Sequence, residues 1–159
     1  MSKPVVHLIG NAHLDPAWLW RWPEGFSEGR ASFASALDQM REYPSFIFTA
    51  GAAAVYQWIE RTAPELFREI RTRVAESRWC VVGGWHAQSD SNLPAGESFA
   101  RNALYSQRYF RKTFGAACRT GYCVDSFGAI TTRASRMSGC CSCRTAPTGA
   151  RRCAGRRTS

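Results

Sequence analysis

Short, nearly continuous apolar runs alternate along this chain with longer stretches in which apolar residues recur every three or four positions. The runs have the length of strands buried on both faces and cover residues 5–9, 46–49, 79–85 and 118–124. The periodic stretches predict helices that each bury one face, at residues 26–41, 52–61, 64–74 and 97–115. Strands that alternate with helices are typical of a parallel sheet with right-handed crossovers, so the sequence predicts an α/β fold.

Proline and glycine mark the ends of the predicted helices. The Tyr43-Pro44 pair disfavours continuation of the first helix, because the residue before a proline avoids the helical conformation. Pro64 suits the first turn of a helix, where its missing N–H would be unpaired in any case. Gly115 is a candidate C-cap for the last helix. These signals predict separate helices.

Charge is divided unevenly between two parts of the 159-residue chain. Residues 1–128 hold 14 Lys and Arg against all 12 acidic residues, whereas residues 129–159, called the tail below, hold seven Arg and no acid. The tail also lacks Leu, Val, Phe, Tyr and Trp, so it cannot bury enough apolar surface to offset its ordering entropy. We therefore expect one folded domain at residues 1–128, followed by a disordered basic tail. A nucleic-acid partner would depend on the tail alone, which argues against that class.

Membrane and secretory signals are not evident in the sequence. No run approaches the roughly 20 apolar residues of a membrane span, and the first residues lack the long apolar region of a signal peptide. We therefore expect a cytoplasmic protein with no membrane partner and with reduced cysteines. Cys140-x-x-Cys143 in the tail has no second pair and no histidine nearby, so it does not indicate a metal site.

Residues with metal-binding side chains lie at the carboxyl ends of the predicted strands. His13 and Asp15 follow the first run at positions i and i+2, which puts both side chains on one side of an extended chain. Asp90 and Asp125 follow the third and fourth runs, and in parallel sheets ligands bind at this edge. Imidazole nitrogen and carboxylate oxygen suit zinc, so His13, Asp15 and Asp125 are candidate ligands, with no evident fourth.

Structural alternatives remain open for the neighbouring polar residues. Asp90 precedes Ser91 and Asn92, and such a group also forms a turn in which the side chain caps its own backbone. His7 lies within a predicted strand and reads more readily as a buried structural histidine. His86 lies in a loop, where a histidine is usually only solvated.

Two aromatic residues stand beside the candidate metal ligands. Trp18 follows His13 and Asp15, and Phe127 follows Asp125 by two positions. Either ring could be part of the core or could stack against the apolar C–H face of a sugar. The remaining tryptophans that we assign to the core are Trp58, Trp79 and Trp85.

Three stretches of this sequence resemble the amino-terminal catalytic domain of glycoside hydrolase family 38, the α-mannosidases. The first is NAHLDPAWLW, residues 11–20, and the last is GYCVDSFG, residues 121–128. The middle stretch runs from Gly83-Gly84-Trp85 through DSNLPAGES at residues 90–98, followed by QRYF at residues 107–110. The resemblance covers residues 5–128 in register.

The resemblance implies a fold, a metal site and an activity. The fold would be the first part of a seven-stranded (β/α) barrel. His13 and Asp15 would bind one zinc ion, and Asp125 would be both a zinc ligand and the catalytic nucleophile. Trp18 and Phe127 would line the mannose pocket, with Asp90 as a further substrate-binding candidate. The substrate would be an α-mannoside or a mannose-containing glycan, hydrolysed with retention through a glycosyl-enzyme.

The sequence also departs from the family pattern. The family's nucleophile motif continues Gly-His, whereas Gly128 here is followed by Ala129. The family's last histidine ligand and its general acid lie beyond the matched stretch. We therefore hypothesise a truncated member whose reading frame shifts after Gly128, with little or no activity of its own. The resemblance leaves open whether full-length members form oligomers.

Two other function classes remain open at the level of sequence. One is a different metal-dependent carbohydrate hydrolase, such as a polysaccharide deacetylase, in which the carboxylate binds metal or acts as a base and no glycosyl-enzyme forms. The other is a non-catalytic binding protein that acts through its basic tail, which predicts steeply salt-dependent nucleic-acid binding.

Overall fold

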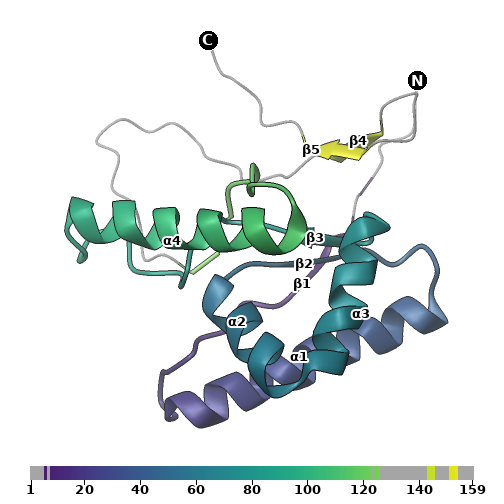
Figure 1. Ribbon diagram of the computed structural model, residues 1–159, viewed down its shortest axis with the longest axis horizontal. Helices are drawn as coiled ribbons and strands as arrows, with labels where there is room; N and C mark the ends of the chain where they lie inside the picture. Colours follow the sequence, from purple (N-terminus) through teal and green to yellow (C-terminus); the bar gives the residue numbers. More distant parts are fainter. Residues whose placement is uncertain (1–5, 7, 123, 126–142, 146–150, 154–159) are drawn as a thin grey trace.

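The computed structural model describes residues 6, 8–122, 124–125, 143–145 and 151–153. Three short strands and four helices make up the main unit (Figure 1). In chain order these are β1 (Gly10–Asn11), α1 (Trp22–Glu42), β2 (Phe48–Ala50), α2 (Ala53–Thr62), α3 (Pro64–Ala75), β3 (Trp79–Val81) and α4 (Gly96–Phe114). All four predicted helices are confirmed, as is an α/β domain with a parallel sheet.

The three strands form one parallel sheet in the order β1-β2-β3. Gly10 pairs with Phe48, and Phe48 pairs in turn with Trp79, so the central strand holds both neighbours in register. The parallel direction requires crossovers, which α1 supplies between β1 and β2, and α2 with α3 between β2 and β3. The carboxyl ends of all three strands therefore point to the same edge of the sheet.

The first strand lies later in the chain than predicted. The apolar run at residues 5–9 is not a strand at its described positions, and Val6 and Leu8 are exposed. Pairing begins only at Gly10, where the Phe46 ring packs so closely that an added Cβ would lie 2.8 Å from it. The apolar run therefore lies next to the strand in sequence, and the strand itself is the segment that pairs with β2.

The predicted fourth strand is absent from the described residues of 118–124. One ladder-like contact is present, from the N–H of Gly83 to the C=O of Thr120 at 2.8 Å. The backbone of Cys118 is instead bonded by the Gln107 side chain, whose Oε1 accepts its N–H (2.8 Å) and whose Nε2 donates to its C=O (3.0 Å). A side-chain amide thus takes the groups that a strand partner would use. The seven-stranded barrel remains a prediction.

Part of the tail forms a two-stranded sheet. Strands β4 (Cys143–Thr145) and β5 (Arg151–Cys153) pair in antiparallel fashion. The prediction of disorder throughout the tail is therefore not confirmed. Gly128, the predicted domain boundary, and Cys140 of the Cys140-x-x-Cys143 motif lie outside the described residues.

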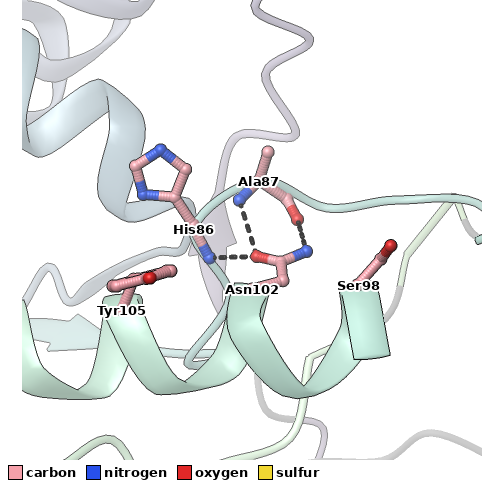
Figure 2. A pocket seen from close by; sticks show the side chains of 5 residues that line it. All are labelled: His86, Ala87, Ser98, Asn102 and Tyr105. Atoms are coloured by element: carbon pink, nitrogen blue, oxygen red, sulfur yellow. Dashed lines mark hydrogen bonds between the residues drawn. The ribbon is translucent and has the colours of Figure 1, made fainter. Parts of the chain in front are cut away.

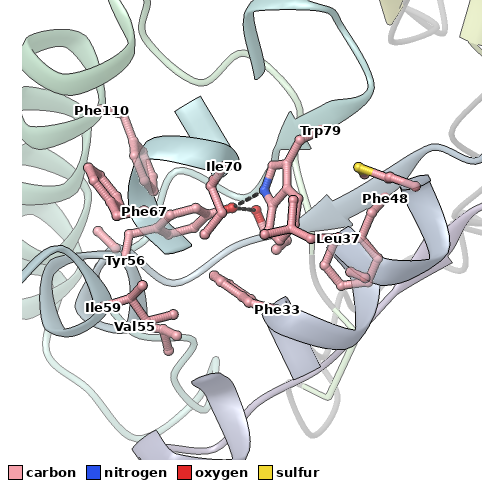
Figure 3. Packing of buried hydrophobic residues seen from close by; sticks show 14 residues of the cluster. Phe33, Leu37, Phe48, Val55, Tyr56, Ile59, Phe67, Ile70, Trp79 and Phe110 are labelled. Atoms are coloured by element: carbon pink, nitrogen blue, oxygen red, sulfur yellow. Dashed lines mark hydrogen bonds between the residues drawn. The ribbon is translucent and has the colours of Figure 1, made fainter. Parts of the chain in front are cut away.

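All four helices contribute side chains to one hydrophobic core (Figure 3). Its fully buried members from the helices and β3 include Phe33, Leu37, Tyr56, Ile59, Ile70, Trp79 and Phe110. Trp79 confirms its predicted place in the core. Trp58 is partly buried and packs against the core, whereas Trp85 is partly buried with its ring against Phe99. Inside the core, the Trp79 Nε1–H donates to the Tyr56 hydroxyl (2.8 Å), which donates to the C=O of Ala50 (3.0 Å). This chain of hydrogen bonds joins β2, α2 and β3.

Helix ends are fixed where the sequence placed them. Pro64 occupies the first turn of α3, and Gly115 caps α4 with a φ of 77°, a left-handed conformation that favours glycine. At the end of α1, the guanidinium of Arg78 donates to the carbonyls of Met40 and Tyr43. Among the described residues, no helix combines the length and apolar character needed to cross a membrane.

Candidate metal centre

The candidate site lies at the carboxyl-end edge of the sheet. His13 and Asp15 follow β1 by two and four residues in a segment without regular structure. This segment packs against α1 at Gly25, where an added Cβ would overlap the Pro16 carbonyl oxygen and lie 2.7 Å from that of Asp15. Asp125 reaches the same place from the segment that follows α4. The predicted meeting of residues more than 100 positions apart is therefore present.

The three side chains converge on one point. His13 Nε2 lies 3.2 Å from Asp15 Oδ1 and 3.6 Å from Asp125 Oδ2. All three potential ligand atoms lie within 4.8 Å of one another. His13 and Asp15 are partly buried, whereas Asp125 is about half exposed, so the group is open to solvent on one side.

This geometry and donor set fit a divalent metal ion. Zinc binds imidazole nitrogen and carboxylate oxygen at about 2.0–2.2 Å, so two ligands of a tetrahedral centre lie about 3.3–3.6 Å apart. The two measured separations from His13 Nε2 are close to that range. Three protein ligands with an open side are also the arrangement of catalytic rather than structural zinc sites.

The second nitrogen of His13 contacts a residue that sequence reasoning missed. His13 Nδ1 lies 3.1 Å from Oε1 of Gln88, a residue of the loop between β3 and α4. Two consecutive glycines with positive φ, Gly83 (81°) and Gly84 (68°), let the chain turn sharply out of β3 into this loop. The GGW motif was visible in the sequence, but nothing in it pointed to Gln88.

A small hollow lies beside His13 and Gln88. Its walls also include Gly51, Trp85 and Tyr122. The Tyr122 hydroxyl is buried and has no hydrogen-bond partner among the described residues, and burial raises the pKa of this phenol. Tyr122 therefore remains neutral and keeps its hydroxyl as a donor next to the candidate centre.

The residues expected to bind substrate differ in their surroundings, and not all of them are described by the structure. Trp18 is exposed, with 62% of its surface accessible, so it is not a core residue. Asp90 Oδ1 accepts the backbone N–H groups of Asn92 (2.6 Å) and Leu93 (3.3 Å), which is the turn chemistry that was its alternative reading. Phe127 and His7 lie outside the described residues. The substrate-binding roles remain predictions.

Fold and site together define a parallel α/β domain with a candidate metal centre at the carboxyl ends of its strands. The model of the Glycosyl hydrolases family 38 N-terminal domain matches residues 3–140, and the chain belongs to this family. The sequence-based recognition of the family is therefore confirmed.

Curated relatives agree with this assignment. The chain is 38% identical over 127 residues to Alpha-mannosidase G of Dictyostelium discoideum, a match that covers 80% of this chain. It is 32% identical over 139 residues to human Alpha-mannosidase 2C1, with 87% of this chain covered. These matches span 12% and 13% of the relatives' own lengths.

A solved structure supports the fold. The crystal structure of an alpha-mannosidase from Enterococcus faecalis V583 superposes with a TM-score of 0.61 at 22% identity. The superposition covers 69% of this chain and 12% of that chain.

Proposed function

We propose that this chain carries the metal-binding and nucleophile residues of a zinc-dependent α-mannosidase. The observation that carries the proposal is the convergence of His13, Asp15 and Asp125 at the carboxyl edge of the sheet. Membership of glycosyl hydrolase family 38, whose curated members matched here are named α-mannosidases, supports the same activity. The substrate class is an α-mannoside or a mannose-containing glycan.

The zinc ligands would be His13 Nε2 and one carboxylate oxygen each from Asp15 and Asp125. A bound zinc ion would supply a Lewis acid that holds sugar hydroxyls and favours the ionised form of a coordinated carboxylate. On its other side, His13 Nδ1 lies 3.1 Å from Oε1 of Gln88. The half-exposed position of Asp125 leaves its carboxylate accessible to a sugar.

Asp125 is the proposed nucleophile of a retaining reaction. Its carboxylate oxygen forms a bond to the anomeric carbon while the bond from that carbon to the leaving oxygen breaks, and a second carboxylic acid gives that oxygen a proton. Water then hydrolyses the glycosyl ester and regenerates the carboxylate. The exposed ring of Trp18 is available to stack on the sugar, and Phe127 and Asp90 are the further substrate-binding candidates.

The test is covalent labelling of the nucleophile. The zinc-loaded chain is incubated with a mechanism-based fluoromannoside, and mass spectrometry locates the label, which we expect on Asp125. Asp125→Asn should remain unlabelled. Because the family's general acid lies beyond the matched stretch, we expect little turnover of an aryl α-mannoside, so the label on Asp125 is the readout and a fluoroglucoside is the control reagent. Zinc-dependent release of acetate from an acetylated polysaccharide, without labelling, would instead favour a deacetylase.

A further inference from the structure

The carboxamide of Gln88 contacts Nδ1 of His13, whereas the other ring nitrogen, Nε2, lies near Asp15 and Asp125. Gln88 Oε1 is a carbonyl oxygen and can only accept, so the hydrogen bond at 3.1 Å requires the proton on His13 Nδ1. The Nε2 lone pair is then available on the side that faces Asp15 and Asp125. The reversed carboxamide would present its NH₂ to Nδ1 and favour a proton on Nε2, which would block the centre.

The loop that carries Gln88 is held in place by α2. This loop has no regular structure, so its backbone groups need partners outside a strand or helix. The C=O of Trp85 accepts the N–H of Ala53 (3.0 Å), and the C=O of His86 accepts the N–H of Ala54 (2.9 Å). Two of the N–H groups that a helix leaves unpaired at its start thus fix the first half of the loop.

The carboxamide of Asn102, on α4, fixes the residue immediately before Gln88 (Figure 2). Its Oδ1 accepts the N–H groups of His86 (2.6 Å) and Ala87 (3.2 Å), and its Nδ2 donates to the C=O of Ala87 (2.8 Å). Together with the two bonds from α2, every backbone polar group from the C=O of Trp85 to the C=O of Ala87 is bonded. Gln88 therefore leaves a rigid support and reaches His13, 75 positions away in sequence.

We propose that Gln88 is a positioning residue of the metal centre and that Asn102 holds it in register. This inference rests on the proposed metal site. Gln88 binds no metal itself; it orients His13 and selects the ring tautomer that leaves Nε2 available. Partners of this kind typically change metal affinity by about 10–100-fold when removed.

A pair of Gln88 variants separates positioning from simple packing. Gln88→Met has a similar size but no oxygen acceptor, and we expect zinc affinity, measured by calorimetric titration of zinc chloride with the full chain, to fall about 10–100-fold. Gln88→Glu keeps an acceptor oxygen and should retain the parent's affinity or exceed it. The zinc-free thermal midpoints of parent and variants should agree. Equal zinc affinity in the parent and Gln88→Met, or equal losses in both variants, would overturn the proposal.

Asn102 is tested through its dependence on Gln88. Asn102→Asp keeps the acceptor for two N–H groups but presents a second oxygen to the C=O of Ala87, so the end of the loop should shift and zinc binding should weaken. In a double-mutant cycle, Asn102→Asp should add little to the loss already caused by Gln88→Met, because both act through His13. Fully additive losses would show that Asn102 acts independently of Gln88 and would remove it from the proposal.

The tautomer can be read in the parent without any variant. In ¹⁵N-resolved spectra of the zinc-loaded chain, we expect His13 with a protonated Nδ1 and a metal-bound Nε2. Metal bound to Nδ1 overturns the role of Gln88 while leaving the metal site intact. A parent chain that binds no zinc at all overturns the site itself, and with it the role of Gln88, so the two failures are distinguishable.

Discussion

At the scale of single residues, Gly25 is where helix α1 contacts the segment that carries His13 and Asp15. We expect Gly25→Ala to lower the free energy of unfolding by about 1–3 kcal/mol, the usual cost of forcing atoms into a packed contact. Its Cβ would meet the carbonyl oxygens of Asp15 and Pro16, which are backbone atoms and cannot rotate away. The same shift would displace Asp15, so zinc affinity should fall as well. Urea unfolding and zinc titration measure the two effects.

Gly96 provides the matched control for this substitution. It begins α4, and an added Cβ there would have nothing within 4 Å. Gly96→Ala should therefore be neutral or slightly stabilising, because alanine has the higher helix propensity. If both alanine variants behave alike, the contact between α1 and the segment that carries His13 and Asp15 is not tight.

The hydroxyl group of Tyr56 should also contribute to the free energy of unfolding. Its hydroxyl accepts from Trp79 and donates to Ala50 inside the core, and burial raises the pKa of the phenol so that it stays neutral. Tyr56→Phe leaves the indole N–H and a strand carbonyl buried without this partner, which should cost about 1–3 kcal/mol. Tyr43→Phe, at a half-exposed position, should leave the urea midpoint almost unchanged. Equal midpoints for the two variants would contradict a structural role for this hydrogen-bond chain.

At the scale of elements, an ion pair connects two helices that lie on the same side of the sheet in Figure 1. Arg41 at the end of α1 donates to both carboxylate oxygens of Glu69 on α3, at 2.7 Å and 3.2 Å. The hydrogen bond from Arg41 is the main cause that lowers the pKa of Glu69. Because the folded-state pKa is depressed, this contribution to stability is present above the unfolded pKa of Glu69 and is lost as the pH falls through the folded value.

A double-mutant cycle tests this bridge between helices. Arg41→Gln and Glu69→Gln should show a coupling in urea unfolding at pH 7 that disappears once the pH is low enough to protonate Glu69, which the lowered pKa places below the usual range of a glutamate. High salt should weaken the coupling at pH 7, since both side chains are partly exposed. A coupling of the same size at both pH values would mean that the two side chains interact by packing rather than charge.

Among the elements, the helices could be predicted from the sequence, whereas the strands could be predicted only in part. Helices were predictable because their apolar stripes recur over several turns, and Pro64 and Gly115 mark their ends chemically. Strands of two or three residues carry too few positions for a pattern, so β1 was misplaced and the segment at Cys118 was read as a strand. Gln107 bonds both backbone groups of Cys118, and a single glutamine on a helix gives no periodic signal.

The candidate site also contains residues that the sequence predicted and residues that it did not. The meeting of His13, Asp15 and Asp125 was predictable from their side-chain types and from the parallel sheet, which places the ends of its strands at one edge. Asp125 reaches that edge from a segment that is not a strand among the described residues. Gln88 and Asn102 were missed because carboxamides that bond backbone or imidazole have no characteristic spacing. Their partners lie up to 75 positions away, and only the folded chain brings them together.

At the scale of the whole molecule, the candidate metal centre brings together residues from the beginning and the end of the α/β unit. His13 and Asp15 lie before α1, and Asp125 lies after α4, so a bound ion would connect segments separated by the whole unit. A ligand that binds only the folded state raises its stability by RT ln(1 + [L]/Kd). Zinc should therefore stabilise this chain as a unit rather than one loop of it.

Thermal unfolding with and without zinc tests this link. At a free zinc concentration of about 100 times Kd, the gain should be about 2.7 kcal/mol, and EDTA should reverse it. For a chain of this size, that gain corresponds to a rise in Tm of about 5–10 °C. Asp125→Asn should lose most of the rise, because a neutral amide replaces an anionic ligand, whereas Asp38→Asn, on the surface of α1, should retain it. An equal rise in Asp125→Asn and the parent would show that zinc binds elsewhere, and that the meeting of His13, Asp15 and Asp125 is not what connects the two ends of the unit.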